Sequence, residues 1–209
     1  MTDVKICGLM RVEDVEEACA LGAAYVGFNF SSGSRRRITP EVARRLAGAC
    51  RDGVRRVGVF VEETYEEILE AIDAASLDIV QIHRTLRSDD LARVSRPVLA
   101  VAHAGRDEEI PPRTLLGRCA GILFDTSDPR RGPGGTGIPF DWFLLKGRTW
   151  PVPLFVSGGL SPENVGESIR TTRPSAVDVA SGVEIAPGVK DRGRLRSFFE
   201  AVRAADAKS

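Results

Sequence analysis

The order of apolar segments along the chain is the feature that most restricts how it can fold. Short runs rich in β-branched residues alternate with longer stretches whose apolar residues recur every three or four positions, a pattern that predicts strands alternating with helices. The predicted strands lie at 4–7, 25–30, 57–61, 79–83, 98–101, 122–125, 154–157 and 176–179. The predicted helices lie at 11–21, 40–50, 65–74, 88–94, 113–118, 141–146, 162–170 and 192–204.

Strands that are apolar on both faces and separated by helices indicate parallel strands buried beneath helices. Eight such units in 209 residues are close to the smallest size of a (β/α)8 TIM barrel. We therefore predict an α/β fold in which residues 1–209 form one barrel domain. A doubly wound open sheet is the alternative, although it usually has fewer strands at this length. Thr39-Pro40 and Ser161-Pro162 predict helix starts, because each places an N-cap residue before a proline.

Composition narrows the possible partners and the location. The 43% of hydrophobic residues can bury a core, which excludes a disordered chain. The 29 basic and 29 acidic residues balance, so we expect no nucleic-acid partner. No apolar run approaches the roughly 18 residues of a membrane span, and nothing in the first residues suggests export, so we expect no membrane partner and a cytoplasmic location. The four cysteines are expected to be free, without a zinc site.

Several polar residues share one face of the predicted strands. Side chains alternate along a strand, so Gln81 and His83 share a face, and Cys7, Asp125 and Asp178 occupy comparable positions on other strands. Any one of them can be an ordinary polar residue at a strand end. Their agreement across four strands favours a shared site, because barrel enzymes build the active site at the carboxyl ends of their strands.

Two of these residues carry chemistry. Cys7 is either a small buried apolar residue or, if its thiol pKa is lowered, a base or nucleophile. Asp125 is either a loop-capping residue or a general acid, which requires a carboxyl that stays protonated near neutral pH. Strands one and six lie on roughly opposite sides of a small barrel mouth. A sugar bound between them would therefore contact Cys7 with one face and Asp125 with the other. Lys5 is expected deeper in the barrel, in a core salt bridge.

Glycine-containing loops follow the last strands. Gly158 and Gly159 follow strand seven and Ser181 and Gly182 follow strand eight, where barrels of this kind usually bind phosphate. The sequence contains neither a P-loop nor a dinucleotide fingerprint, so nucleotide cofactors are not indicated.

Two further loops at the predicted mouth are polar. The loop after strand six contains Gly134, Gly135, Thr136 and Gly137, which we interpret as a mobile lid or a merely flexible loop. Arg36, in a basic run after strand two, either is solvated or binds a carboxylate with both arms of its guanidinium.

These residues together resemble the phosphoribosylanthranilate isomerase family nearly from end to end. The matching segments are, in chain order, Lys5-Ile6-Cys7-Gly8, Val26-Gly27-Phe28, Ile38-Thr39-Pro40, Val57-Gly58-Val59-Phe60, Val80-Gln81-Ile82-His83, Leu123-Phe124-Asp125-Thr126, Phe140-Asp141-Trp142, Gly158-Gly159-Leu160-Ser161-Pro162-Glu163-Asn164-Val165, Val177-Asp178-Val179, Ser181-Gly182-Val183-Glu184 and Gly188-Val189-Lys190-Asp191. Each tetrapeptide is unspecific, but the ordered set is highly specific. Arg84 departs from the pattern, because the family usually has glycine there.

The resemblance implies an Amadori rearrangement of N-(5-phosphoribosyl)anthranilate without a cofactor or metal, in tryptophan biosynthesis. It implies that the acid at Asp125 protonates the furanose oxygen and that the cysteine at Cys7 removes the proton from C2. It also implies that Arg36 binds the anthranilate carboxylate. It assigns the phosphate to Gly158, Gly159, Ser181 and Gly182 and leaves Gln81, His83 and Asp178 as supports of the pocket. We expect a small phosphosugar as partner and a monomer or homodimer.

Three other functions remain possible for a chain with these residues. A related aminoaldose isomerase of histidine biosynthesis uses an aspartate at the position of Cys7. A Schiff-base aldolase needs a reactive lysine, and among the four lysines only Lys5 faces inward on a predicted strand. A catalytically inactive barrel that binds a phosphosugar is a third possibility, against which the Cys7 and Asp125 pair argues.

Overall fold

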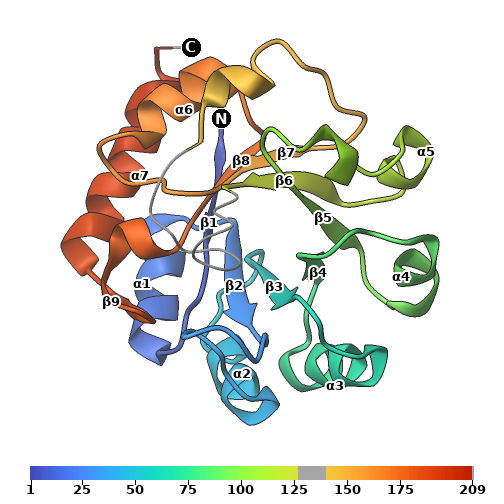
Figure 1. Ribbon diagram of the computed structural model, residues 1–209. Helices are drawn as coiled ribbons and strands as arrows, with labels where there is room; N and C mark the ends of the chain where they lie inside the picture. The colour runs from blue at the N-terminus through green and yellow to red at the C-terminus, as the bar shows by residue number, and fades with distance from the viewer. Residues whose placement is uncertain (127–139, 209) are drawn as a thin grey trace.

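The computed structural model describes residues 1–126 and 140–208, and these residues form a closed eight-stranded parallel barrel surrounded by helices (Figure 1). Every strand pairs in parallel with the next one along the chain, and the last strand pairs with the first. The strands are β1 (Asp3–Ile6), β2 (Tyr25–Asn29), β3 (Arg55–Phe60), β4 (Ile79–Ile82), β5 (Val98–His103), β6 (Gly121–Asp125), β7 (Leu154–Val156) and β8 (Ala176–Val179). The predicted (β/α)8 TIM barrel is confirmed, and closure excludes the open sheet.

Helices follow the strands on the outside of the barrel. The α-helices are α1 (Val12–Leu21), α2 (Pro40–Ala47), α3 (Tyr65–Ala75), α4 (Ser88–Arg93), α5 (Arg113–Leu116), α6 (Val165–Thr172) and α7 (Arg192–Asp206). Shorter elements are the 3-10 turns η1 (Asp107–Glu109), η2 (Trp142–Leu145) and η3 (Ser181–Val183) and the hairpin strands β9 (Glu184–Ala186) and β10 (Val189–Lys190). The helix predicted at 141–146 is therefore a short 3-10 turn.

One of the two predicted helix starts is correct. The Thr39 hydroxyl accepts a hydrogen bond from the amide of Val42, so Thr39 caps α2 with Pro40 as its first residue. The start predicted at Ser161-Pro162 is wrong, because α6 begins at Val165. The side chain of Asn164 turns back to the preceding loop, where it accepts from the Ser161 amide and donates to the Gly159 carbonyl, so a turn precedes the helix.

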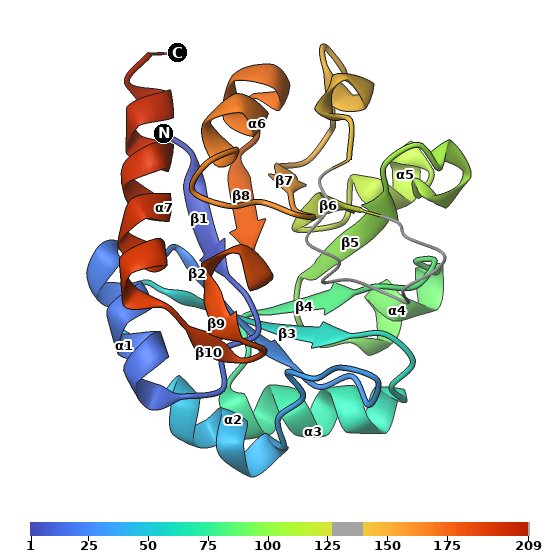
Figure 2. The same ribbon diagram turned by 60° about the vertical axis from the view of Figure 1, so that its left-hand side comes forward.

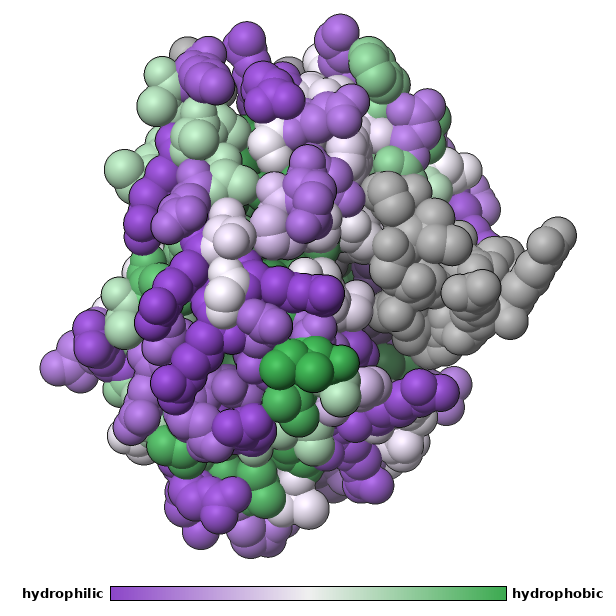
Figure 3. All heavy atoms as spheres, turned by 90° about the vertical axis from the view of Figure 1, so that its left-hand side faces the viewer, coloured by the Kyte–Doolittle hydropathy of each residue, from purple (hydrophilic) through white to green (hydrophobic). Residues whose placement is uncertain are grey.

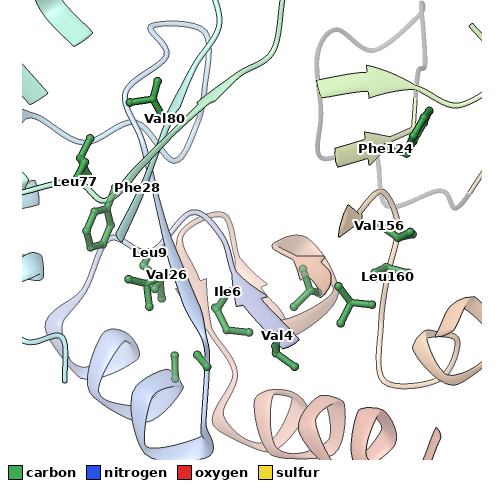
Figure 4. Packing of buried hydrophobic residues seen from close by; sticks show 14 of the residues in the cluster. Val4, Ile6, Leu9, Val26, Phe28, Leu77, Val80, Phe124, Val156 and Leu160 are labelled. Carbon is green, nitrogen blue, oxygen red and sulfur yellow. The ribbon is translucent and has the colours of Figure 1, made fainter. Parts of the chain in front are cut away.

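Alternation along the strands divides the apolar residues into two layers. One cluster fills the barrel interior and includes Val57, Leu99 and Phe155. The larger cluster lies between the strands and the helices, and Figure 4 shows Val4 and Ile6 of β1 pointing outward into it. The strand parity inferred from the sequence is thereby confirmed.

The barrel interior also contains a buried ion pair between the first and last strands. Lys5 lies opposite Asp178 in the parallel register of β1 and β8, and its Nζ is 2.8 Å from Asp178 Oδ2. Neither side chain is appreciably exposed, so the pair is shielded from solvent. Water therefore cannot stabilise one charge if the other is removed. The salt bridge expected for Lys5 is confirmed.

The β9–β10 hairpin follows β8 and leads into α7, beside the first residues of that helix (Figure 2). The face of the molecule that carries α1, α7 and this hairpin is mostly hydrophilic, with separate small hydrophobic areas (Figure 3). None of the helices that the structure describes is both long and apolar enough to cross a membrane.

Lys5→Met should destabilise the protein by about 3–5 kcal/mol, because it leaves the Asp178 carboxylate buried without its cation. The double variant Lys5→Met/Asp178→Leu should recover a large part of this loss, since both charges are then removed together. Urea denaturation measures each free energy of unfolding. Lys208→Met, at an exposed lysine, is the control. A loss below about 1 kcal/mol for Lys5→Met would show that the pair contributes little.

Candidate active site

A cavity of about 630 Å³ opens at the carboxyl ends of the barrel strands. Most residues predicted for the site line it, namely Cys7, Arg36, Gln81, His83, Asp125, Gly158, Gly159, Asp178 and Ser181. Asn29, the last residue of β2, and Ser31, in the loop that leads to Arg36, also line it and were not predicted. The residues that the sequence placed on one face are therefore gathered around one cavity.

Two groups of predicted residues are not part of this lining. Gly182 is absent from the cavity wall in the described part of the chain. A Cβ at Gly182 would lie 1.9 Å from the carbonyl oxygen of Leu160, so this glycine lets the loops after β7 and β8 pack against each other. Gly134, Gly135, Thr136 and Gly137, the predicted lid, lie outside the described residues.

Cys7 is the first residue after β1, and its amide donates to the carbonyl of Val179 at the end of β8. A Cβ at Gly27 would lie 2.9 Å from Cys7 Sγ, so a side chain on β2 would displace the thiol. Burial raises the pKa of the Cys7 thiol, although the ammonium groups of Lys5 and Lys190 oppose the rise. A base role requires a lowered thiol pKa, whereas the raised pKa of Cys7 leaves its thiol protonated at neutral pH.

Asp125 ends β6 on the opposite side of the barrel mouth. Its Oδ1 accepts a hydrogen bond of 2.7 Å from the Thr126 amide, and the residue is 7% exposed. Burial raises the pKa of the carboxyl to about 6, although the Thr126 amide opposes the rise. A carboxyl with this pKa is partly protonated near neutral pH, which is the condition for a general acid.

The loop after β7 passes close to Asp125 because it carries glycine. Gly158 has φ +80, and a Cβ there would lie 2.2 Å from Thr126 Oγ1 and 2.9 Å from Asp125 Oδ1. No other residue fits at this position without moving the acid. Within the described residues, the amides of Gly158, Gly159 and Ser181 have no acceptor, so three backbone donors are available to an anion at the cavity.

Gln81 on β4 and His83, the first residue after this strand, form a hydrogen bond of 2.6 Å between Gln81 Nε2 and His83 Nε2. Burial, helped by the nearby Lys5 ammonium, lowers the pKa of His83 to about 3. The ring is therefore neutral at physiological pH, and its Nε2 accepts the amide proton of Gln81. His83 is a hydrogen-bonding group of the wall rather than an acid.

Arg36 reaches the cavity from the loop after β2. Its Nε lies 2.9 Å from Glu184 Oε1 and its Nη2 lies 2.7 Å from Glu184 Oε2. The stem of the side chain crosses Gly8, where a Cβ would lie 2.3 Å from Arg36 Cδ. The carboxylate partner seen in the structure thus belongs to the protein. Sequence reasoning missed this role of Glu184, because a glutamate in a polar loop has no local feature that distinguishes it from a solvated one.

Arg84, where the resembled family usually has glycine, does not line the cavity. Its guanidinium forms hydrogen bonds of 2.9 and 2.6 Å with the carboxylate of Asp90 on α4, which is fully buried. The hydroxyl of Tyr65 donates to the same carboxylate. Arg84 therefore links the segment after β4 to the neighbouring helices α3 and α4 and is not part of the cavity wall.

Comparisons with known proteins agree on one family. A family model described as N-(5'-phosphoribosyl)anthranilate (PRA) isomerase matches residues 4–201. A similar curated protein, the N-(5'-phosphoribosyl)anthranilate isomerase of Rhodopseudomonas palustris, is 40% identical over 97% of this chain and 96% of its own length. The phosphoribosyl anthranilate isomerase of Thermotoga maritima superimposes with a TM-score of 0.87 at 36% identity, over 98% of this chain and 100% of that one.

A further solved phosphoribosyl anthranilate isomerase holds reduced 1-(o-carboxyphenylamino)-1-deoxyribulose 5-phosphate. It is 35% identical to this chain and superimposes with a TM-score of 0.83, over 98% of this chain and 100% of that one.

Asp125→Asn should stabilise the protein above pH 6, because the native carboxyl has a raised pKa and must ionise in a buried position. The folded state keeps the proton between about pH 4 and 6 while the unfolded state loses it, so the wild type loses stability as the pH rises through this window. Unfolding by urea should show equal stabilities near pH 4 and an advantage of about 3 kcal/mol for the variant at pH 8. A difference that does not change with pH would contradict the raised pKa.

Proposed function

Since the chain belongs to the N-(5'-phosphoribosyl)anthranilate isomerase family, we propose that Cys7 and Asp125 carry the two proton transfers of its reaction. The enzyme converts N-(5'-phosphoribosyl)anthranilate to 1-(2-carboxyphenylamino)-1-deoxyribulose 5-phosphate in tryptophan biosynthesis. The observation that carries the proposal is the pair itself. A buried carboxyl with a pKa of about 6 and a thiol face one cavity from β6 and β1.

In the first step, the protonated Asp125 carboxyl donates its proton to the furanose ring oxygen. The bond between C1 and this oxygen breaks, and the nitrogen lone pair forms the C1=N bond of an open-chain iminium. Burial supports this role, because it favours the neutral carboxyl before the step and leaves the new carboxylate in a low-dielectric site beside the cationic intermediate.

In the second step, the Cys7 thiolate removes the proton from C2. The electrons of that C–H bond form a C1=C2 double bond and return a lone pair to the nitrogen, which gives an enolamine that tautomerises to the ketose. The iminium acidifies C2, so a sulfur base suffices. The thiol must first give its own proton to water at the open cavity, and the ammonium groups of Lys5 and Lys190 are the charges that favour the thiolate.

Binding groups surround this pair. The free amides of Gly158, Gly159 and Ser181, with Gly182 as packing support, are the proposed phosphate site, since backbone donors at glycine loops bind anions well. Arg36 is proposed to bind the anthranilate carboxylate with the guanidinium hydrogens that Glu184 leaves free. Gln81, His83 and Asp178 form the wall. A substrate held at both ends brings C2 and the ring oxygen to the two catalytic groups.

We further propose a cytoplasmic enzyme in which residues 1–209 form one domain. Both a monomer and a homodimer fit the site, because residues of a single chain line the cavity. Light scattering of the purified protein separates the two states.

Cys7→Ser and Asp125→Asn should each lose at least about 100-fold in kcat, the usual contribution of a general acid or base. The assay follows the loss of phosphoribosylanthranilate fluorescence after the substrate is generated in situ. Circular dichroism of each variant verifies that it is folded. Near-full activity in either folded variant would remove that residue from its role, whereas loss in both with retained substrate-analogue binding supports the pair.

Alkylation by iodoacetamide should inactivate the native enzyme slowly, because burial keeps the Cys7 thiol protonated at neutral pH. The inactivation rate should rise with pH, and reduced product analogue should protect the enzyme. Mass spectrometry of the modified peptides identifies the thiol, and Cys119→Ala serves as a matched control outside the cavity. Inactivation that accompanies only unfolding would identify Cys7 as a packing residue.

A further inference from the structure

A buried cluster of three charges lies beside the cavity, and one of its members, Glu184, has no part in the reaction described so far. It consists of Arg36, Glu184 and Lys190, whose side chains are 16%, 4% and 0% exposed. Glu184 begins β9 and Lys190 ends β10, so the hairpin after β8 supplies two of the three charges. Of the three residues, only Arg36 lines the cavity.

Glu184 holds the guanidinium of Arg36 by a two-point contact along one edge. The contact uses Nε and one hydrogen of Nη2, at 2.9 and 2.7 Å from the two carboxylate oxygens. In the part of the chain that the structure describes, both hydrogens of Nη1 and the second hydrogen of Nη2 have no acceptor. The edge of the guanidinium that remains free is thus suited to a second, external carboxylate.

Lys190 fixes Glu184 in turn. Its Nζ donates to Glu184 Oε1 at 2.8 Å, to the Cys7 carbonyl at 2.6 Å and to the Ala180 carbonyl at 3.1 Å. All three ammonium hydrogens are therefore used, and the contacts join the hairpin to the carboxyl ends of β1 and β8. Glu184 Oε1 also accepts from the amide of Gly188 at 3.2 Å. The carboxylate has little freedom to rotate.

From this arrangement we propose that Glu184 is a positioning residue for substrate binding, which fixes the guanidinium of Arg36 so that its free edge receives the anthranilate carboxylate. The inference rests on the carboxylate role proposed for Arg36. Glu184 does not line the cavity, so it acts only through Arg36. The stem of Arg36 packs in the space that Gly8 leaves by lacking a side chain, and Glu184 holds the guanidinium, which reduces the rotamer entropy lost when the substrate binds.

Positioning and simple charge predict opposite results when Glu184 is neutralised. By Coulomb attraction alone, Glu184→Gln removes a negative charge beside Arg36 and should tighten binding of an anionic substrate. If Glu184 orients Arg36, the same variant should weaken binding, because the guanidinium loses its charged two-point support. The direction of the change in KM therefore separates the two explanations.

The experiment measures kcat and KM with two substrates, N-(5'-phosphoribosyl)anthranilate and its analogue made from aniline, which lacks the carboxylate. For Glu184→Gln we expect KM for the anthranilate substrate to rise about tenfold with a small change in kcat, since a charge-assisted hydrogen bond contributes on this order. The kcat/KM ratio for the aniline analogue should stay near that of wild type. Glu200→Gln, at an exposed carboxylate on α7, is the matched control.

Two further variants complete the test. Glu184→Asp keeps the charge beside Lys190 but shortens the side chain, so positioning predicts a raised KM here as well, whereas a charge effect predicts wild-type behaviour. This variant also decides the question if Glu184→Gln does not fold. In an Arg36→Met background, Glu184→Gln should have no additional effect on KM.

The outcomes distinguish this inference from the proposal on which it rests. If Arg36→Met raises KM but Glu184→Gln lowers it or leaves it unchanged, Arg36 binds the carboxylate and the positioning role of Glu184 is wrong. An equal loss with both substrates would likewise overturn it, because the effect would not pass through the carboxylate. If Arg36→Met leaves KM unchanged, both the carboxylate role of Arg36 and this inference fail.

Discussion

The pairing of β8 with β1 is the constraint on which the rest of this structure depends. It closes the barrel, it brings Lys5 next to Asp178 in the interior, and it places the ends of the first and last strands side by side. The Cys7 amide then reaches the Val179 carbonyl, and Lys190 bridges the carbonyls of Cys7 and Ala180. An open sheet would separate these groups and would expose the interior ion pair to water.

Burial of the titratable side chains at the barrel mouth sets their pKa values and therefore their chemical properties. Burial raises the pKa of Asp125 to about 6 and lowers that of His83 to about 3, so the carboxyl is partly protonated near neutral pH and the imidazole is uncharged. The same effect keeps Cys7 protonated before substrate binds. The ammonium groups of Lys5 and Lys190 oppose this rise in the thiol pKa, so the buried charges influence the chemistry as well as the stability of the fold.

Strand parity was sufficient to predict most of the cavity wall. Cys7, Gln81, His83, Asp125 and Asp178 were placed on one side of their strands by alternation alone, and all of them line the cavity. Features formed by the loops were harder to predict. The start expected at Ser161-Pro162 was wrong because Asn164 bonds backward to the loop, and Glu184 was missed because its partner Arg36 is 148 residues away in the chain.

The sequence by itself determined the alternation of strands and helices, the direction in which each strand side chain points and therefore which residues meet at the mouth. These properties follow from local periodicity, which short segments carry independently of their neighbours. Only the tertiary structure decided the protonation of Cys7 and Asp125 and the pairing of Arg36 with Glu184. Burial and charge contact depend on residues that come together only when the barrel closes, so no local pattern encodes them.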